Sequence, residues 1–304
     1  MSILVTGGAG FIGSHIVNAY LEAGHRVTVI DNLSSGERRF LNPGAKFYEM
    51  DILDAKIADI IKTEKIDTIN HHAAQISVSE SVKNPLFDAN ANIIGTLQLL
   101  KIAVSSGVKK FILASTGGAI YGDQVHFPAN ENHPCHPLSP YGISKLSAEN
   151  YLRFFNEQYD LSTTVLRYSN VFGPHQNPHG EAGVVAIFCQ KLVQDQVPTI
   201  CGDGEQTRDF ISVRDVVQAN LIALAPTCLG TFNIGTGKET SVNALTDCLL
   251  SITSKNISAE HVSPRDGEQR RSVIDFQKFH KSFGWKPKVS LEQGLIETYD
   301  FFRK

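Results

Sequence analysis

The segment Thr6-Gly7-Gly8-Ala9-Gly10-Phe11-Ile12-Gly13 decides the fold, because of what stands on either side of it. Residues 3–5 are a short apolar run that predicts a buried strand, and apolar residues at helical spacing follow the glycines. Gly24 is suited to end that helix, and residues 26–30 predict a second strand that leads to Asp31. A strand, a glycine-rich turn, a helix and a second strand in this order predict a dinucleotide-binding unit.

The glycine-rich turn also predicts which cofactor binds. Residues without side chains let the backbone approach a pyrophosphate, and the N-terminus of the following helix favours its negative charge. Asp31 stands about 20 residues further on, where a carboxylate suits a ribose 2′-hydroxyl. A carboxylate there repels a 2′-phosphate, so the sequence predicts NAD rather than NADP. The glycine spacing is GxxGxxG instead of the more common GxGxxG.

A second informative segment is Tyr141-Gly-Ile-Ser-Lys145. Residues four apart on a helix lie on the same face, so the phenol and the amine would be neighbours. A phenol with a pKa near ~10 is a poor base at neutral pH, and a nearby ammonium group favours the phenolate. Helices carry many such pairs on their surfaces, but together with a nucleotide-binding turn this pair is a candidate for proton transfer.

The composition of the 304-residue chain argues against several classes of protein. The net charge is −3, and charges of both signs are mixed, so we expect no nucleic-acid partner and no membrane attachment. No apolar run approaches the ~18 residues of a membrane span. The five scattered cysteines lack C-x-x-C spacing, which favours reduced thiols in the cytoplasm. The segment His133-Pro-Cys-His136 is more typical of a loop than of a metal site, so we expect no metal.

Strand and helix patterns alternate through the first half of the chain, which predicts parallel βαβ units. Beyond Gly173-Pro174, shorter elements alternate with polar loops. We expect a Rossmann-type doubly wound parallel sheet over residues 1–172, joined by residues 209–226, and a smaller C-terminal α/β substrate lobe within residues 173–304. The further expected strands are 46–50, 66–71, 111–114 and 163–168, and the further expected helices are 55–63, 86–106 and 141–159.

Several conspicuous segments end or follow expected strands. In open α/β sheets, ligands bind beyond the carboxyl ends of the strands, so these segments should line one crevice. They are the glycine turn, Asp31, Asp51, Ala73-Ala74, Ser115-Thr116 and Tyr168.

Taken together, the motifs resemble the extended short-chain dehydrogenase/reductase family, the NAD-dependent nucleotide-sugar epimerases and dehydratases. Within the family, the chain is most similar to members that invert C4 of a UDP-hexose through a 4-keto intermediate, interconverting UDP-glucose and UDP-galactose. The resemblance runs nearly end to end. Its segments are TGGAGFIGSH (6–15), DNLSSG (31–36), HAAQ (72–75), NIIGT (92–96), YGISK (141–145), LRYSNVFGP (166–174), GDGEQTRDFISVRD (202–215), FNIGTG (232–237) and PRDGE (264–268).

The resemblance implies a role for each matching residue. Tyr141 would be the acid/base, and Lys145 would bind the nicotinamide ribose and lower the tyrosine pKa. Arginines suit the substrate diphosphate because their fork matches phosphate oxygens. The implied NAD contacts are Gly7, Gly10, Phe11, Ile12, Gly13, Asp31, Asn32, Asp51, Ile52, Ala73, Ala74, Asn92, Tyr141, Lys145 and Tyr168. The implied substrate contacts are Thr116, Tyr141, Asn170, Arg208, Arg265 and Ser272.

One position departs from the family pattern. A serine or threonine beside the tyrosine usually bonds the reacting 4-oxygen, but Gly117 stands there. The adjacent Thr116 could substitute, or Tyr141 could act alone. Gly117 and Gly118 also argue against a 4,6-dehydratase, which needs an Asp-Glu pair at this point.

Substrate choice and assembly stay open at this point. Ser272 falls where the family places a pocket-lining residue, and a small residue leaves room for a 2-acetamido group, as in UDP-GlcNAc and UDP-GalNAc. An exposed Ser272 would carry no such information. The alternatives are a UDP-glucuronate 4-epimerase or related sugar modifier, and a non-catalytic NAD-binding regulator. The resemblance implies a homodimer through helices 86–106 and 141–159, although their apolar stripes equally fit an internal core.

Overall fold

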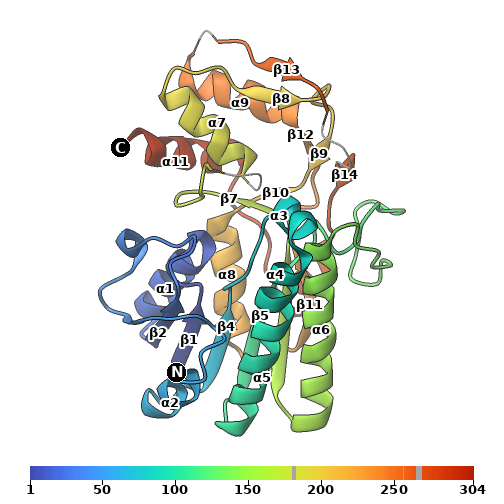
Figure 1. Cartoon of the computed structure of the whole chain (residues 1–304). Helices are drawn as coiled ribbons and strands as arrows, with labels where there is room; N and C mark the ends of the chain where they lie inside the picture. The colour runs from blue at the N-terminus through green and yellow to red at the C-terminus, as the bar shows by residue number, and fades with distance from the viewer. Residues whose placement is uncertain (180–182, 256, 265–268) are drawn as a thin grey trace.

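The computed structural model describes residues 1–179, 183–255, 257–264 and 269–304 (Figure 1). Its centre is a sheet of seven strands, all parallel, in the order β11-β6-β5-β4-β1-β2-β3. The winding reverses between β1 and β4, so the expected Rossmann-type doubly wound sheet is confirmed. The strands are β1 (Ser2–Thr6), β2 (Arg26–Asp31), β3 (Lys46–Glu49), β4 (Thr68–His71), β5 (Lys110–Thr116), β6 (Ser162–Tyr168) and β11 (Gly230–Ile234).

Helices cover both faces of this sheet. Because successive side chains of a strand point to opposite faces, Ile3 and Val5 pack in one hydrophobic cluster and Leu4 in another. The first cluster lies under α1 (Phe11–Glu22), α8 (Val213–Ala223) and α10 (Gln277–Phe283). The second lies under α2 (Ile57–Thr63), α5 (Gly95–Ser105) and α6 (Pro140–Tyr159). Residues 213–223 therefore return to the main sheet, where α8 packs against α1.

The remaining elements lie above the carboxyl ends of the sheet strands in Figure 1. Three helices, α7 (Val184–Val193), α9 (Val242–Thr253) and α11 (Leu291–Arg303), share a third hydrophobic cluster. Short strands pair beside them. They are β7 (Asn170–Phe172) with β10 (Phe210–Ser212), β8 (Thr199–Cys201) with β13 (Glu260–Val262), and β9 (Thr207–Arg208) between β12 (Thr240–Ser241) and β14 (Arg271–Ser272).

The single helix expected over residues 86–106 is not continuous. The structure has α4 (Pro85–Ala89), a π-helical segment (Asn90–Ile94) and then α5. The wider turn places the Asn92 side chain inward, where its amide donates to Asp88 Oδ1 at 3.0 Å. A helix α3 (Val78–Lys83), which the sequence analysis did not predict, precedes α4. π-Helical turns often mark functional positions, and Asn92 of this one bonds the backbone of Gln75 in the loop after β4.

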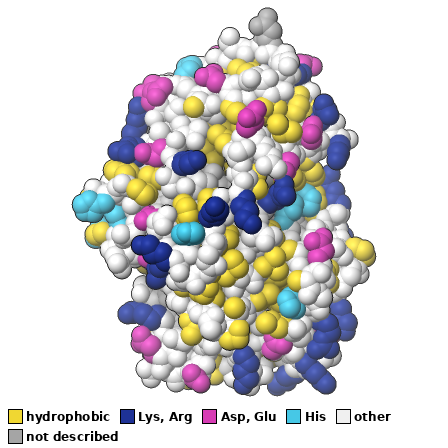
Figure 2. All heavy atoms as spheres, turned by 180° about the vertical axis from the view of Figure 1, so that it is seen from behind, with side chains coloured by type: hydrophobic (Ala, Val, Ile, Leu, Met, Phe, Trp, Pro, Cys, Tyr) yellow, Lys and Arg dark blue, Asp and Glu magenta, His cyan; other side chains and the backbone are white. Residues whose placement is uncertain are grey.

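Figures 1 and 2 show opposite sides of the molecule. Figure 1 shows α5 and α6 next to each other on one face of the sheet, and the two helices contact each other. Figure 2 shows the opposite face, on which basic and acidic side chains both occur among apolar ones. No helix in the described ranges is both long and apolar enough to span a membrane.

Candidate functional site

The glycine-rich turn brings β1, α1 and the end of β4 into close backbone contact. Gly7 has a positive φ of 70°, and a Cβ there would lie 2.6 Å from the backbone nitrogen of Ala73. A Cβ on Gly13 would lie 2.1 Å from the Gly7 oxygen. Gly10 caps α1 without a side-chain hydrogen bond, and the first turn, which begins with Phe11-Ile12, has no acidic residue. The N–H groups of this turn therefore offer an anion-binding site, and the turn fits a pyrophosphate.

The acidic residues after β2 and β3 lie together, as the sequence predicts. Asp31 Oδ2 accepts a hydrogen bond from the Ala9 N–H at 2.9 Å, and Oδ1 accepts from a second backbone N–H at 2.8 Å. Asn32 Nδ2 donates to Asp51 Oδ2 at 2.8 Å. Ile52 is buried against α5. Carboxylate oxygens accept more than one bond each, so Asp31 can hold the glycine turn and still receive a hydroxyl.

Asn92 braces the loop that follows β4. Its Oδ1 accepts from the Gln75 N–H at 3.0 Å, and its Nδ2 donates to the Gln75 carbonyl at 2.9 Å. The bond to Asp88 uses the same amide group. The Asn92 side chain therefore holds the loop after β4, in which the backbone of Ala73 lies against Gly7 of the glycine turn.

Tyr141 and Lys145 lie in the first turns of α6, and burial changes both pKa values. Ser139 caps this helix, and its Oγ accepts a hydrogen bond from the Gly142 N–H at 3.1 Å. Burial raises the pKa of Tyr141 to about 12, a hydrogen bond with the Thr116 side chain opposes the rise, and the charge of Asp88 adds to it. Burial lowers the pKa of Lys145 to about 8. Within the described ranges, Thr116 and Asp88 are thus the side chains that shift the phenol pKa, so the lysine alone does not supply a phenolate at neutral pH.

The missing hydroxyl at Gly117 has a steric cause. A Cβ on Gly117 would lie 2.6 Å from Cδ1 and 3.0 Å from Cγ2 of Ile274, whose side chain is 1% exposed. The Gly117 N–H donates to the Tyr168 carbonyl at 2.7 Å, which holds the backbone in place. Ile274 therefore fills the space of a serine or threonine side chain, and the preceding residue, Thr116, supplies the hydroxyl that contacts Tyr141.

The sequence analysis did not single out His72 as a site residue, although it begins the HAAQ motif. His72 Nε2 lies 3.1 Å from Tyr168 Oη, which also receives a hydrogen bond from Asn220 Nδ2 at 2.9 Å. Burial, and then the charge of Lys145, lower the pKa of His72 to about 3, so the ring is neutral. The Tyr168 hydroxyl therefore faces a buried polar network. Within the described part of the chain, the buried Nδ1 of His72 has no hydrogen-bond partner.

The expected substrate residues come from the short strands above the sheet. Arg208 in β9 pairs in register with Ser272 in β14, and its Nη1 donates to the Thr207 carbonyl at 2.8 Å. Ser272 is 3% exposed, so it is not a surface serine. Asn170 begins β7, and its buried Oδ1 has no hydrogen-bond partner among the described residues. Arg265 lies outside the described residues.

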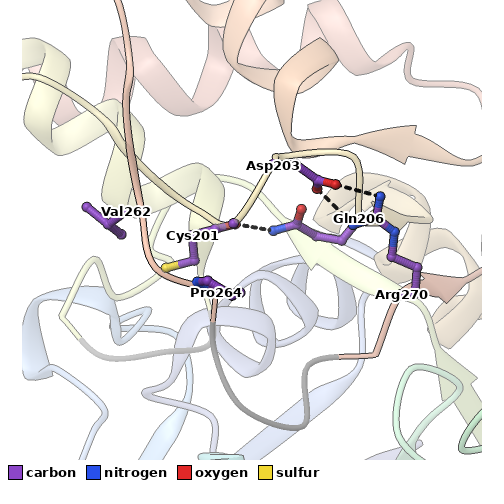
Figure 3. Close-up of a pocket in the computed structure, with 7 residues that line it drawn as sticks. Cys201, Asp203, Gln206, Val262, Pro264 and Arg270 are labelled. Carbon is purple, nitrogen blue, oxygen red and sulfur yellow. Dashed lines mark hydrogen bonds and ion pairs between the residues drawn. The ribbon is translucent and has the colours of Figure 1, made fainter.

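A cavity of about 430 Å³ lies beside these strands (Figure 3). The Asp203 carboxylate and the Arg270 guanidinium form an ion pair at its edge, with N–O distances of 2.8 and 2.9 Å. Gln206 Nε2 donates to the Cys201 carbonyl at 2.9 Å. The sequence analysis missed this cavity, because its lining comes from segments far apart in the chain. The lining residues are Cys201, Gly202, Asp203, Gln206, Val262, Pro264 and Arg270.

The described residues contain no group of three or more His, Cys, Asp or Glu side chains that could hold a metal ion. All five cysteines are unpaired.

The chain is similar to known proteins over its whole length. A model described as the NAD dependent epimerase/dehydratase family matches residues 3–235. A protein of Methanocaldococcus jannaschii named putative UDP-glucose 4-epimerase is 45% identical over 301 residues, 99% of this chain and 98% of that protein. The crystal structure of UDP-glucose 4-epimerase with UDP-glucose from Thermotoga maritima is 50% identical, with a TM-score of 0.96 and coverage of 100% and 99%. UDP-N-acetylglucosamine 4-epimerase from Methanobrevibacter ruminantium M1, in complex with UDP-N-acetylmuramic acid, is 36% identical, with a TM-score of 0.94 and coverage of 99% and 97%.

The contact between Gly117 and Ile274 makes a stability prediction. Gly117→Ser should lower the free energy of unfolding by about 1–3 kcal/mol, because the new side chain overpacks against Ile274. Ile274→Ala alone should also destabilise the protein, but within that background the serine should cost less, because the side chain it contacts is gone. Gly118→Ala is the matched control, since a Cβ there meets nothing closer than 3.7 Å. Chemical denaturation measures all four proteins, and a Gly117→Ser variant as stable as Gly118→Ala would contradict the steric explanation.

Proposed function

Because the chain belongs to the NAD dependent epimerase/dehydratase family, we propose that it is an NAD-dependent 4-epimerase that interconverts UDP-glucose and UDP-galactose. The observation that carries the proposal is the placement of the buried Tyr141 phenol beside the Thr116 side chain at the end of β5, on the same carboxyl edge of the sheet as the glycine turn. Gly117 and Gly118 carry no acid, which favours epimerisation over 4,6-dehydration.

The chain's residues divide the chemistry between them. Tyr141 takes the proton of the sugar 4-hydroxyl and later returns it, and Thr116 orients that hydroxyl and the phenol. The Lys145 ammonium holds the nicotinamide ribose. Bound NAD would supply a positively charged nicotinamide ring, which favours the phenolate and can take a hydride from C4 of the sugar and give it back. Between the two hydride transfers the 4-keto sugar rotates to present its other face. The site must therefore hold the nucleotide firmly and the hexose loosely.

Cofactor and substrate contact different parts of the chain in this proposal. Residues 1–172 with 209–226 form the NAD-binding domain, to which β11 and α10 also belong because they pack in the central sheet and its core, and the rest of 173–304 forms the substrate lobe. The cofactor contacts are those expected from the resemblance, from Gly7 to Tyr168. Asn170, Arg208 and Arg265 hold the diphosphate, and the cavity at Cys201 takes the nucleoside end of the substrate. The similarity to the Thermotoga maritima structure, which contains UDP-glucose, supports a UDP-sugar as the substrate.

We further propose that the enzyme accepts UDP-GlcNAc and UDP-GalNAc. Ser272 is small, buried and in register with Arg208, so it leaves space beside the sugar without exposing the pocket. The similarity to UDP-N-acetylglucosamine 4-epimerase of Methanobrevibacter ruminantium supports this extension.

The protein is a homodimer in this proposal. Exposed apolar side chains gather on α4, the π-helical segment and α6, and pairing of these elements with a second copy would bury them. Leu86 is 82% exposed, which is unusual for a leucine in a helix. The other exposed apolar residues here are Phe87, Ile94, Ile143, Tyr151 and Phe154.

We place the protein in the cytoplasm. Five unpaired cysteines suit a reducing compartment, where thiols persist without forming disulfides. Detection of the protein in the soluble cytoplasmic fraction, with five titratable thiols after denaturation, would support this location.

The first prediction for activity concerns Tyr141. Purified protein without added NAD should convert UDP-galactose to UDP-glucose, and Tyr141→Phe should lower kcat by about 10²–10⁴-fold, because the proton acceptor is lost. Bound dinucleotide, measured after release by denaturation, should be retained. Thr116→Val should also lose activity and Thr116→Ser should keep most of it. Wild-type turnover in Tyr141→Phe would contradict the assignment, and turnover of UDP-galacturonate alone would favour the glucuronate alternative.

A second prediction concerns the sugar. Wild-type protein should epimerise both UDP-galactose and UDP-GalNAc, and Ser272→Tyr should lose the acetamido substrate selectively, because the ring fills the space for the acetamido group. Ser272→Ala is the size-matched control and should keep both activities. Product ratios by chromatography decide the outcome. A wild-type enzyme inactive on UDP-GalNAc would refute the pocket argument.

A third prediction concerns assembly. Light scattering after size-exclusion chromatography should give twice the chain mass, and Leu86→Asp with Phe154→Asp should give the monomer mass, because charges would be buried in the interface. Val125→Asp changes another exposed apolar residue, in the loop before α6, and should leave the dimer intact. A wild-type monomer at micromolar concentration would contradict the proposal.

A further inference from the structure

A buried ion pair between Glu149 of α6 and Arg167 of β6 lies one helical turn beyond Lys145. Glu149 stands one helical turn after Lys145 in α6, and its carboxylate accepts from Arg167 Nε at 3.0 Å and from Nη2 at 2.6 Å. Ser115 Oγ donates to the same carboxylate at 2.5 Å. Both charged residues are more than nine-tenths buried. A buried ion pair contributes little more to protein stability than apolar residues of similar size. Stability alone therefore does not explain why these two charges are buried here.

The pair belongs to a longer chain of hydrogen bonds. Arg167 Nη1 donates to Tyr121 Oη at 2.9 Å, and Tyr121 Oη donates to Asn233 Oδ1 at 2.7 Å. These residues come from β6, from the segment after β5 and from β11. Through Glu149, helix α6 is therefore tied to three neighbouring parts of the central sheet.

We propose that Glu149 is a positioning residue for proton transfer: it fixes α6 against β5 and β6 and places a negative charge beside the Lys145 amine. Ser115 directly precedes Thr116, so the bond from Ser115 to Glu149 also fixes the strand end from which Thr116 contacts Tyr141. The inference rests on the proposed roles of Tyr141 and Lys145 and adds to them the group that sets their geometry and charge.

Several elements place titratable groups around Lys145. Glu149 on its own helix and Asp88 on α4 raise the pKa of Lys145 against the larger effect of burial, which leaves it at about 8. His71 ends β4 and His72 follows it, and burial first and then the Lys145 charge lower the pKa of both. A lysine carries its charge below its pKa. Removing the Glu149 charge lowers that pKa further, so the ammonium form is lost at a lower pH.

The test is the ionisation of Lys145 in the holoenzyme, followed by NMR of ¹³C-labelled lysine. The signal is assigned from its absence in Lys145→Arg. In Glu149→Gln, the amine should titrate lower by about one pH unit or more. The alkaline limb of kcat should move to lower pH by a similar amount, with a smaller change in KM.

Two further variants separate positioning from stability. Glu149→Gln leaves Arg167 without a counter-charge and costs stability, whereas Glu149→Gln with Arg167→Met removes both charges and should recover it. The Lys145 titration should stay low in the double variant, because Glu149 is the partner of this pair that acts on Lys145. Glu157→Gln, exposed near the end of α6, is the control and should titrate as wild type.

Two results would overturn the proposal: an unchanged Lys145 titration in Glu149→Gln, or a return to the wild-type titration once the double variant recovers stability. Either would leave Glu149 with a purely structural role. The titration needs no turnover. An inactive wild-type enzyme would therefore reject the proposed function without affecting this test.

Discussion

The packing of α6 against the carboxyl ends of β5 and β6 is the constraint on which the site depends. Tyr141, Lys145 and Glu149 follow at four-residue intervals, so they share one face over about two turns of the helix. That face meets Thr116 at the end of β5 and Arg167 in β6. A rotation of the helix by one residue, about 100°, would break these contacts together. The ion pair at Glu149 holds the orientation that the contact between Tyr141 and Thr116 needs.

Burial acts in opposite directions on the two ionisable groups of this face. It raises the pKa of Tyr141 to about 12 and lowers that of Lys145 to about 8, so the two values move apart and both charged forms are disfavoured. The Thr116 hydrogen bond favours the phenolate, and Glu149 and Asp88 favour the ammonium. The residues that position these two groups therefore also limit how far burial shifts their pKa values. The same side chains set both the geometry and the electrostatics of the site.

The sequence predicted the parts of the molecule that depend on local patterns. The turn at Gly7, the parallel strands and the Tyr141 helix follow from glycine spacing and apolar periodicity within short windows. The π-helical segment depends on bonds between Asn92 and a distant loop, and the reason for Gly117 is Ile274, more than 150 residues away by sequence number. The cavity at Cys201 unites several separate segments. Periodicity carries no signal for such long-range contacts, and the Arg265 prediction lies outside the described residues.

The central claim is that a hydride leaves C4 of the sugar, is held by a cofactor that stays bound, and returns to the same sugar carbon. Tyr141 transfers only the proton of the 4-hydroxyl. The most direct measurement uses UDP-galactose deuterated at C4, incubated with the enzyme in ordinary water. Mass spectrometry of the UDP-glucose formed should find the deuterium retained at C4. Replacement of that deuterium by solvent hydrogen would show that C4 exchanges with water, and would contradict the account.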